Sequence, residues 1–288
     1  MHGHLISDQK DLSEDEKLAE RTAADAASDL LAQVIRLKEE KVYSEEALSK
    51  SIQLIRLNPE LALAWNFRRE AILGSGQGLD LTEELKLVNN VMVDLLMTKS
   101  YCLWNHRRWI LSQIADVETN IIQGETDLVG TILDLDARNF HAWSYRKWLS
   151  LNFAAAVKWD DLSFSRHLIE KDFSNYSAWH LRRSCCDLIN KEDELELVWN
   201  ALFTEPSDQS CWQYHDWLIE KFPQLVPKDD MYLQELESVI AEKDSKYILL
   251  RKLSRMENQP AEKEQIAHTL IRIDPLRKGL YLDLIESA

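Results

Sequence analysis

The sequence predicts an all-α fold, a right-handed α–α superhelix of helical hairpins with the shape of a crescent. Glycine and proline number only 7 and 6 in 288 residues, too few for a protein built on many tight β-turns. A tryptophan recurs with spacings of 39, 39, 36 and 33 residues, at Trp65, Trp104, Trp143, Trp179 and Trp212. A period of this length is typical of stacked two-helix units.

The helices are expected in pairs, one carrying the tryptophan and one amphipathic. Residues 1–43 hold a tail and a charged helix that begins at the capping-box pattern Ser13-Glu-Asp-Glu16 and ends near Glu40. Apolar residues at i, i+3 and i+4 spacing predict the second helices at 82–96, 117–135, 160–170, 193–203 and 229–241. The sequence thus predicts one domain over residues 1–288, with about five to six repeats in 44–288, the last one degenerate at Tyr281.

One glycine-rich segment, Gly74-Ser-Gly-Gln-Gly78, resembles a phosphate-binding loop only superficially. No strand precedes it, and no Gly-Lys-Ser/Thr follows. We interpret it as a turn.

The tryptophan motif continues with basic residues three and four positions later, and often with a second tryptophan five positions later. At 100° per residue, Trp104, Arg107 and Arg108 share one helical face. An arginine stem packs along an indole while its charged head reaches out to solvent. The motif therefore indicates repeat packing before it indicates a functional site.

Composition excludes several function classes. The chain has 34 Lys and Arg against 49 Asp and Glu, a net charge of −15, which repels nucleic acids and anionic lipids. Its longest apolar runs are about five residues, as at 153–157, far below the roughly 20 that span a membrane. The four cysteines contain no CxxC pattern, so neither a disulfide framework nor a zinc ribbon is indicated. Without a secretory leader at the start, we expect a cytoplasmic protein.

The chain contains no familiar motif of a self-sufficient enzyme, such as HExxH, Gly-x-Ser-x-Gly or a Walker sequence. Lys99 and Arg138, however, each lie five residues before a repeat tryptophan, where a loop meets a helix N-terminus. Asn139 and Asn175 lie nearby. Backbone N–H groups at a helix N-terminus together with a Lys or Arg form an anion site. The alternative, that both cations are solvated loop residues, stays open at this point.

Several segments resemble a known family. The repeated Trp-x-x-Arg-Arg-Trp pattern is similar to the α-subunit repeats of protein prenyltransferases, over essentially the whole chain. Within that family, the type II branch, which acts on Rab GTPases, is the most similar. The segments that carry this resemblance are Met1-His2-Gly3, residues 136–143, 173–180 and 274–283, and above all residues 202–212. The chain departs from the pattern at Gln213 and Asp216, and it lacks the second tryptophan at Glu70 and Ser184.

The resemblance implies an α subunit that is active only in a heterodimer. Its β-subunit partner would hold the zinc, so that this chain alone holds no cofactor; a role for Mg²⁺ is left open. The reaction would transfer geranylgeranyl from geranylgeranyl diphosphate to C-terminal cysteines of a Rab GTPase that an escort protein presents. A zinc-bound cysteine thiolate attacks C1 of the prenyl diphosphate, and cations stabilise the leaving diphosphate.

The resemblance also implies roles for particular residues. Lys99 would be the lysine that reaches the diphosphate. His2 would be an extra ligand to the β-subunit zinc, unless the N-terminal tail is untethered. The other residues of the diphosphate rim would be Arg138, Asn139, Phe140, His141, Asn175 and Tyr176.

Two other functions remain as alternatives. The chain could be the α subunit shared by farnesyltransferase and geranylgeranyltransferase type I, although the Pro-rich N-terminal extension usual there is absent. It could also be a non-catalytic, tetratricopeptide-like scaffold. Lys99 distinguishes the scaffold hypothesis from both transferase hypotheses. A scaffold has no need of a cation where the loop of the second repeat meets its tryptophan helix.

Overall fold

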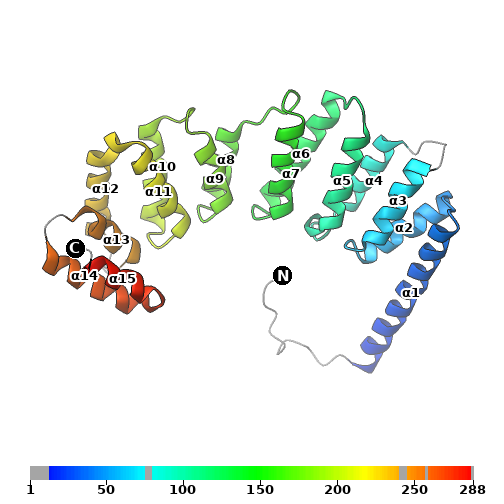
Figure 1. The fold of residues 1–288 in the computed structure, drawn as a ribbon, viewed down its shortest axis with the longest axis horizontal. Coiled ribbons are helices and arrows are strands. Elements are labelled where there is room, and N and C mark those ends of the chain that lie inside the picture. Colours follow the sequence, from blue (N-terminus) through cyan, green and yellow to red (C-terminus); the bar gives the residue numbers. More distant parts are fainter. Residues whose placement is uncertain (1–12, 75–79, 240–244, 257–258, 287–288) are drawn as a thin grey trace. The chain divides into compact units, whose positions relative to one another are not determined.

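The computed structural model describes residues 13–74, 80–239, 245–256 and 259–286 (Figure 1). These residues form helices and no strand, so the predicted all-α fold is confirmed. The chain divides into two compact units, Met1–Lys158 and Trp159–Ala288, which are described separately below. The predicted crescent and the single domain stay predictions. None of the described helices is long and apolar enough to cross a membrane.

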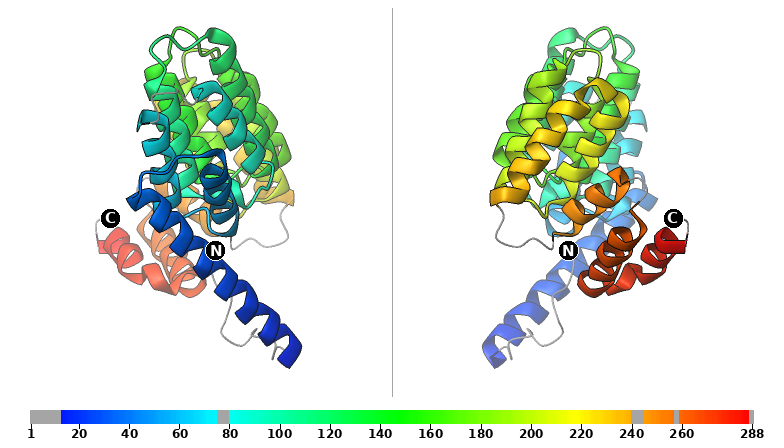
Figure 2. Two further views of the ribbon diagram at one scale, coloured as in Figure 1. Left: turned by 90° about the vertical axis from the view of Figure 1, so that its right-hand side faces the viewer. Right: turned by 90° about the vertical axis from the view of Figure 1, so that its left-hand side faces the viewer.

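The first unit contains a long N-terminal helix and three hairpins. Helix α1 (Glu14–Glu39) follows the predicted range, packs on α2 and extends beyond the hairpins of its unit (Figure 2). The hairpins pair α2 (Glu45–Leu57) with α3 (Ala62–Gly74), α4 (Leu81–Val91) with α5 (Tyr101–Gln113), and α6 (Thr119–Leu135) with α7 (Phe140–Asn152). The tryptophan helices α3, α5 and α7 pack on one another in turn.

The second unit repeats this arrangement. Its hairpins pair α8 (Asp161–Lys171) with α9 (Tyr176–Ser184), α10 (Lys191–Thr204) with α11 (Gln209–Lys221), and α14 (Pro260–Ile273) with α15 (Lys278–Glu286). Helices α12 (Val226–Val239) and α13 (Lys246–Arg255) lie between the last two pairs along the chain, and the short 3₁₀ turns η3 (Pro223–Leu225) and η4 (Pro275–Arg277) precede α12 and α15. Tyr281, the predicted degenerate repeat position, is fully buried against Leu249, Ile266 and Leu270.

One predicted helix is wrong at its end. The range 82–96 was expected to be continuous, but α4 stops at Val91. The Asp94 side chain accepts a hydrogen bond from the Leu96 amide at 2.9 Å, and the Thr98 hydroxyl donates to the Leu95 carbonyl at 2.6 Å. These local bonds compete with the helix and lead into the 3₁₀ turn η2 (Met97–Lys99). The predicted turn after Gly74 and the predicted end at residue 241 lie outside the described residues.

The repeat tryptophan fixes the loop that precedes its own helix. In all five repeats its indole N–H donates to the carbonyl six residues earlier, at 2.6 to 2.9 Å. In the last four, the residue four positions before the tryptophan caps the helix with its side chain: Ser100, Asn139, Asn175 and Asp208. Capped N–H groups and a satisfied carbonyl hold each loop in one conformation.

The basic residues of the motif do not behave as expected. We expected the arginine three positions after the tryptophan to reach out to solvent, but its head is buried. Arg107 donates to both oxygens of Glu125 at 2.5 Å, and Arg182 donates to Glu194 at 2.5 and 2.7 Å. The exposure of the four such arginines, Arg68, Arg107, Arg146 and Arg182, is between 1 and 5%. Burial of this cation requires the paired carboxylate, because an isolated charge is too costly to desolvate.

Candidate functional site

Lys99 lies at the end of η2, directly before the N-terminus of α5. Thr98 beside it is fully buried, and its carbonyl accepts the Trp104 indole N–H at 2.6 Å. The Asn139 amide donates to the Thr98 hydroxyl at 3.0 Å. The backbone of Lys99 is therefore anchored from two repeats, while its side chain stays 60% exposed. Its ammonium is 3.5 Å from the half-buried Asp136 carboxylate, a long ion pair with its cation in solvent that a more highly charged ligand can displace.

Aromatic side chains lie at the helix N-termini next to this cation. Tyr101 and Phe140 are the first residues of α5 and α7, and they are 65% and 73% exposed. The His141 ring meets both edge to face, with centroid distances of 6.0 and 5.7 Å. Burial lowers the pKa of His141; Glu60 opposes this effect, and Arg108 adds to it. A cation beside exposed rings and a neutral imidazole suits a ligand with an anionic head and an apolar body.

Arg138 occupies the same repeat position as Lys99, five residues before Trp143, and its side chain is exposed. The next residue, Asn139, is only 4% exposed, since it caps α7 by accepting from the Ala142 amide at 3.0 Å. The structure therefore brings Lys99, Asn139, Phe140 and His141 together at one end of the α5 and α7 helices. Arg138 lies in the α6–α7 loop at that end.

Two of the predicted rim residues lie in the second unit. Asn175 is 1% exposed and caps α9 by accepting from the Ala178 amide at 3.2 Å. Tyr176, the first residue of α9, is 59% exposed. That these two residues line the same rim as Lys99 stays a prediction.

His2 lies outside the described residues, so its predicted zinc contact also stays a prediction. Among the residues that the structure does describe, no group of three His, Cys, Asp or Glu side chains could hold a metal ion.

Tyr101 was not among the residues predicted from the sequence. It lies three residues before its tryptophan, as do Phe140 and Tyr176. The recurrence of an aromatic residue at this position was the signal that could have identified it.

Comparison with known proteins gives these features a context. The family description "Protein prenyltransferase alpha subunit repeat" matches residues 81–114, 122–153, 159–189 and 191–222. The geranylgeranyl transferase type-2 subunit alpha of Saccharomyces cerevisiae is 30% identical over 296 aligned positions, covering 89% of this chain and 90% of the relative. The Mus musculus protein of the same name is 32% identical over 241 positions, covering 76% of this chain; the chain matches only 42% of that longer relative.

A solved structure is also similar. It is described as Candida albicans protein geranylgeranyltransferase-I complexed with GGPP; the matching chain has a TM-score of 0.70 and 25% identity, covering 91% of this chain and 90% of that one. The stacked hairpins and their tryptophan motif thus define a protein prenyltransferase α-subunit repeat fold. With the yeast relative similar over nearly its whole length, the chain belongs to the family of geranylgeranyl transferase type-2 α subunits. The resemblance seen in the sequence is confirmed.

Proposed function

We propose that this chain is the α subunit of a heterodimeric, cytoplasmic protein geranylgeranyltransferase. Together with a prenyltransferase β subunit it transfers geranylgeranyl from geranylgeranyl diphosphate to C-terminal cysteines of Rab GTPases, which an escort protein presents. Family membership supports the reaction class. The single structural observation that carries a direct role for this chain is the anchored, exposed Lys99 at the helix end where α5 and α7 begin with the exposed rings of Tyr101 and Phe140.

The chemistry requires a cation where the leaving group forms. The cysteine sulfur forms a bond to C1 of the prenyl group, and the C1–O bond breaks with its electron pair going to the diphosphate. A zinc ion on the β subunit would supply the thiolate by lowering the thiol pKa. In this proposal the Lys99 ammonium leaves Asp136 and binds a diphosphate oxygen as negative charge builds up there. A positioned charge of this kind is worth on the order of 10²–10³ in rate.

The neighbouring residues have supporting roles in this proposal. Phe140, His141 and Tyr176 line the path of the apolar chain, and Arg138 adds a second cation. Asn139 and Asn175 hold the helix N-termini at the diphosphate rim through their caps. His2 would occupy the β-subunit zinc until substrate displaces it.

The test is co-expression with prenyltransferase β subunits, followed by transfer of labelled geranylgeranyl to a Rab GTPase with its escort protein. We expect Lys99→Ala to lower kcat by about 10²–10³-fold while the heterodimer stays intact. Lys86→Ala is the matched control, because Lys86 is also exposed, ion-paired and in the first unit; it should leave turnover unchanged. Normal turnover of the Lys99 variant would contradict its role, and failure to bind any β subunit would favour the scaffold alternative.

A second candidate has a specific observation in its favour. The similar solved structure is a type I enzyme, so the chain could be the subunit shared by farnesyltransferase and geranylgeranyltransferase type I. Offering farnesyl diphosphate with a peptide that ends in a single prenylatable cysteine motif separates the two. Transfer to such a peptide without escort protein would support the shared subunit, whereas strict dependence on Rab and escort protein supports the type II assignment.

A further inference from the structure

Each tryptophan helix carries a stripe of three exposed or half-buried positions, located three residues before the tryptophan and one and four residues after it. These positions are spaced i, i+4 and i+7, so they share one helical face. In α5 and α9 the stripe holds an aromatic residue, a hydrogen-bonding residue and an arginine. The two stripes are Tyr101, Asn105 and Arg108, and Tyr176, His180 and Arg183.

In the first unit the stripe arginine is bonded to the next repeat. Arg69 donates to the Asn105 amide oxygen at 2.6 Å, and its guanidinium lies 5.3 Å from the Trp109 ring centroid. Arg108 in turn donates to the Ser144 hydroxyl at 2.8 Å. Asn105 and Ser144 occupy the same position, one residue after the tryptophan. A short side chain there supplies the acceptor for the arginine of the preceding repeat.

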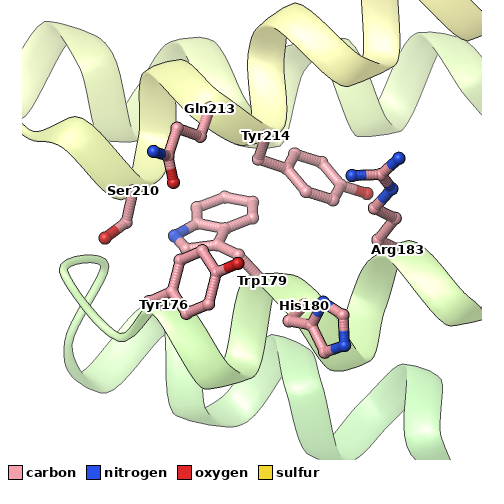
Figure 3. A pocket seen from close by; sticks show the side chains of 7 residues that line it. All are labelled: Tyr176, Trp179, His180, Arg183, Ser210, Gln213 and Tyr214. Atoms are coloured by element: carbon pink, nitrogen blue, oxygen red, sulfur yellow. The ribbon is translucent and has the colours of Figure 1, made fainter.

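Arg183 in the second unit differs. It lies 5.2 Å from the Trp217 ring centroid, as Arg69 does from Trp109. Within the described part of the chain, however, its guanidinium makes no hydrogen bond or ion pair. In the next repeat, the residue after Trp212 is Gln213, which takes the position of Asn105 and Ser144. Figure 3 shows the Gln213 amide near Ser210, with the Tyr214 ring between it and Arg183. The guanidinium is therefore held in place by stacking while its N–H donors remain available.

These donors border an open pocket of about 310 Å³ between α9 and α11 (Figure 3). Its walls combine the Trp179 and Tyr176 rings with hydrogen-bonding groups of His180, Ser210 and Gln213. The Tyr214 hydroxyl is already used, because it donates to the buried Glu194 at 2.7 Å. Arg183 is the one permanent cation among the lining residues, so the pocket suits a group with a single negative charge rather than a diphosphate. A guanidinium fork matches a carboxylate through two parallel hydrogen bonds.

We propose that this pocket receives an aspartate or glutamate side chain of the β subunit, with its carboxylate on Arg183. The position within the repeat supports this occupant. Tyr176 corresponds to Tyr101 and Phe140, which flank Lys99, so the pocket lies on the face of its hairpin that corresponds to the candidate site. The inference rests on the proposed function, since it needs the β subunit as partner.

The experiment measures the dissociation constant of the heterodimer for full-length variants. Arg183→Gln should raise Kd by about 10- to 100-fold, the loss expected for a charge-assisted hydrogen bond. Arg183→Lys keeps the charge but not the fork and should fall in between. Lys221→Gln is the matched control, because it removes one exposed charge at the opposite end of α11; it should leave Kd unchanged.

Single Asp→Asn and Glu→Gln substitutions across the β subunit then identify the carboxylate that binds Arg183. One position should weaken binding in the wild-type chain but not in the Arg183→Gln chain. Equal Kd values for wild type and Arg183→Gln, or the absence of any such position, would overturn the pocket assignment while leaving the proposed function intact. If the wild-type chain binds no β subunit at all, both fall together.

Discussion

The two units share their buried side and differ on their exposed side. Arg68 in the first unit bonds to the Leu48 carbonyl, the Ser51 hydroxyl and the Glu84 carboxylate. Arg182 in the second bonds to the Leu162 carbonyl, the Ser165 hydroxyl and the Glu194 carboxylate. Two hairpins from different halves of the chain thus reproduce one buried arrangement, side chain for side chain.

The exposed residues around this shared frame are different. The first unit has Lys99 in the loop before a tryptophan helix, where the fourth repeat has Ser174. Its stripe arginines are bonded to the next repeat, while Arg183 is not. The comparison shows that the buried positions specify the fold and the exposed positions distinguish one repeat from another. Substitutions at the two kinds of position should therefore affect different measurements.

The largest effect is expected at the buried arginines. Arg107→Met and Arg182→Met each leave a carboxylate buried without its cation, which costs about 3–5 kcal/mol. In urea unfolding, the free energy of unfolding should fall by this amount for both variants, because the two arginines occupy equivalent buried positions. Arg183→Gln, one residue further along, is the control and should change unfolding by less than about 1 kcal/mol. A large loss for Arg107→Met with a small loss for Arg182→Met would break the equivalence of the two units.

A smaller effect concerns the pH dependence of the free energy of unfolding, which should differ between the environments of Glu84 and Glu194. Each takes a second hydrogen bond from the next tryptophan helix, but the donor is His106 for Glu84 and Tyr214 for Glu194. Arg69 donates to Nδ1 of His106 at 3.3 Å, so Nδ1 carries no proton and Nε2 donates to Glu84. Burial lowers the pKa of His106; Glu84 opposes this effect, and Arg69 and Arg68 add to it.

Because the native pKa of His106 is depressed, the unfolded chain binds a proton before the native chain does. Stability should therefore fall as the pH drops below about 6.5, by up to about 1.4 kcal/mol per pH unit. His106→Tyr installs the donor that Glu125 and Glu194 already have, in Tyr145 and Tyr214, and should reduce the slope. The check is urea unfolding between pH 7 and 5; parallel curves for wild type and variant would contradict the assignment of this proton to His106.

The smallest effect is expected at Asp136, next to Lys99. Asp136→Asn keeps the shape of the side chain but removes the charge that pairs with the ammonium. An exposed ion pair is worth at most about 1 kcal/mol, so KM for geranylgeranyl diphosphate should fall by up to about fivefold. Asp127→Asn, in helix α6, which ends just before Asp136, is the control and should leave KM unchanged. A higher KM in the Asp136 variant would argue that the carboxylate helps to position Lys99.

The sequence was sufficient to predict the helical hairpins but not the buried arginine–glutamate pairs that join one hairpin to the next. The tryptophan period predicts the order of helices, because the indole occupies the same buried place in every repeat. The carboxylate that pairs with the arginine has no fixed spacing: Glu84 follows Arg68 by 16 residues and Glu194 follows Arg182 by 12. The length of the loop that joins one hairpin to the next varies, so a pattern search has no constant interval to find.

The candidate site was also only partly predictable from the sequence. Lys99 was accessible to sequence reasoning because it keeps a constant distance from its tryptophan. Its ion pair with Asp136, 37 residues away, depends on how two hairpins stack. The availability of Arg183 depends on the direction in which Gln213 points, which only side-chain packing determines.

The shared carboxylates also limit how such a chain can change its length during evolution. Glu125 binds Tyr145 of its own hairpin and Arg107 of the preceding one, and Glu194 binds Tyr214 and Arg182 in the same manner. Deleting a hairpin, or inserting a copy, places a new hairpin next to a buried glutamate. The change is tolerated only if that new hairpin supplies a hydrogen-bond donor to the glutamate. A recombination event in a loop therefore has to preserve the phase of the repeat, and hairpins are gained or lost as whole, matched modules.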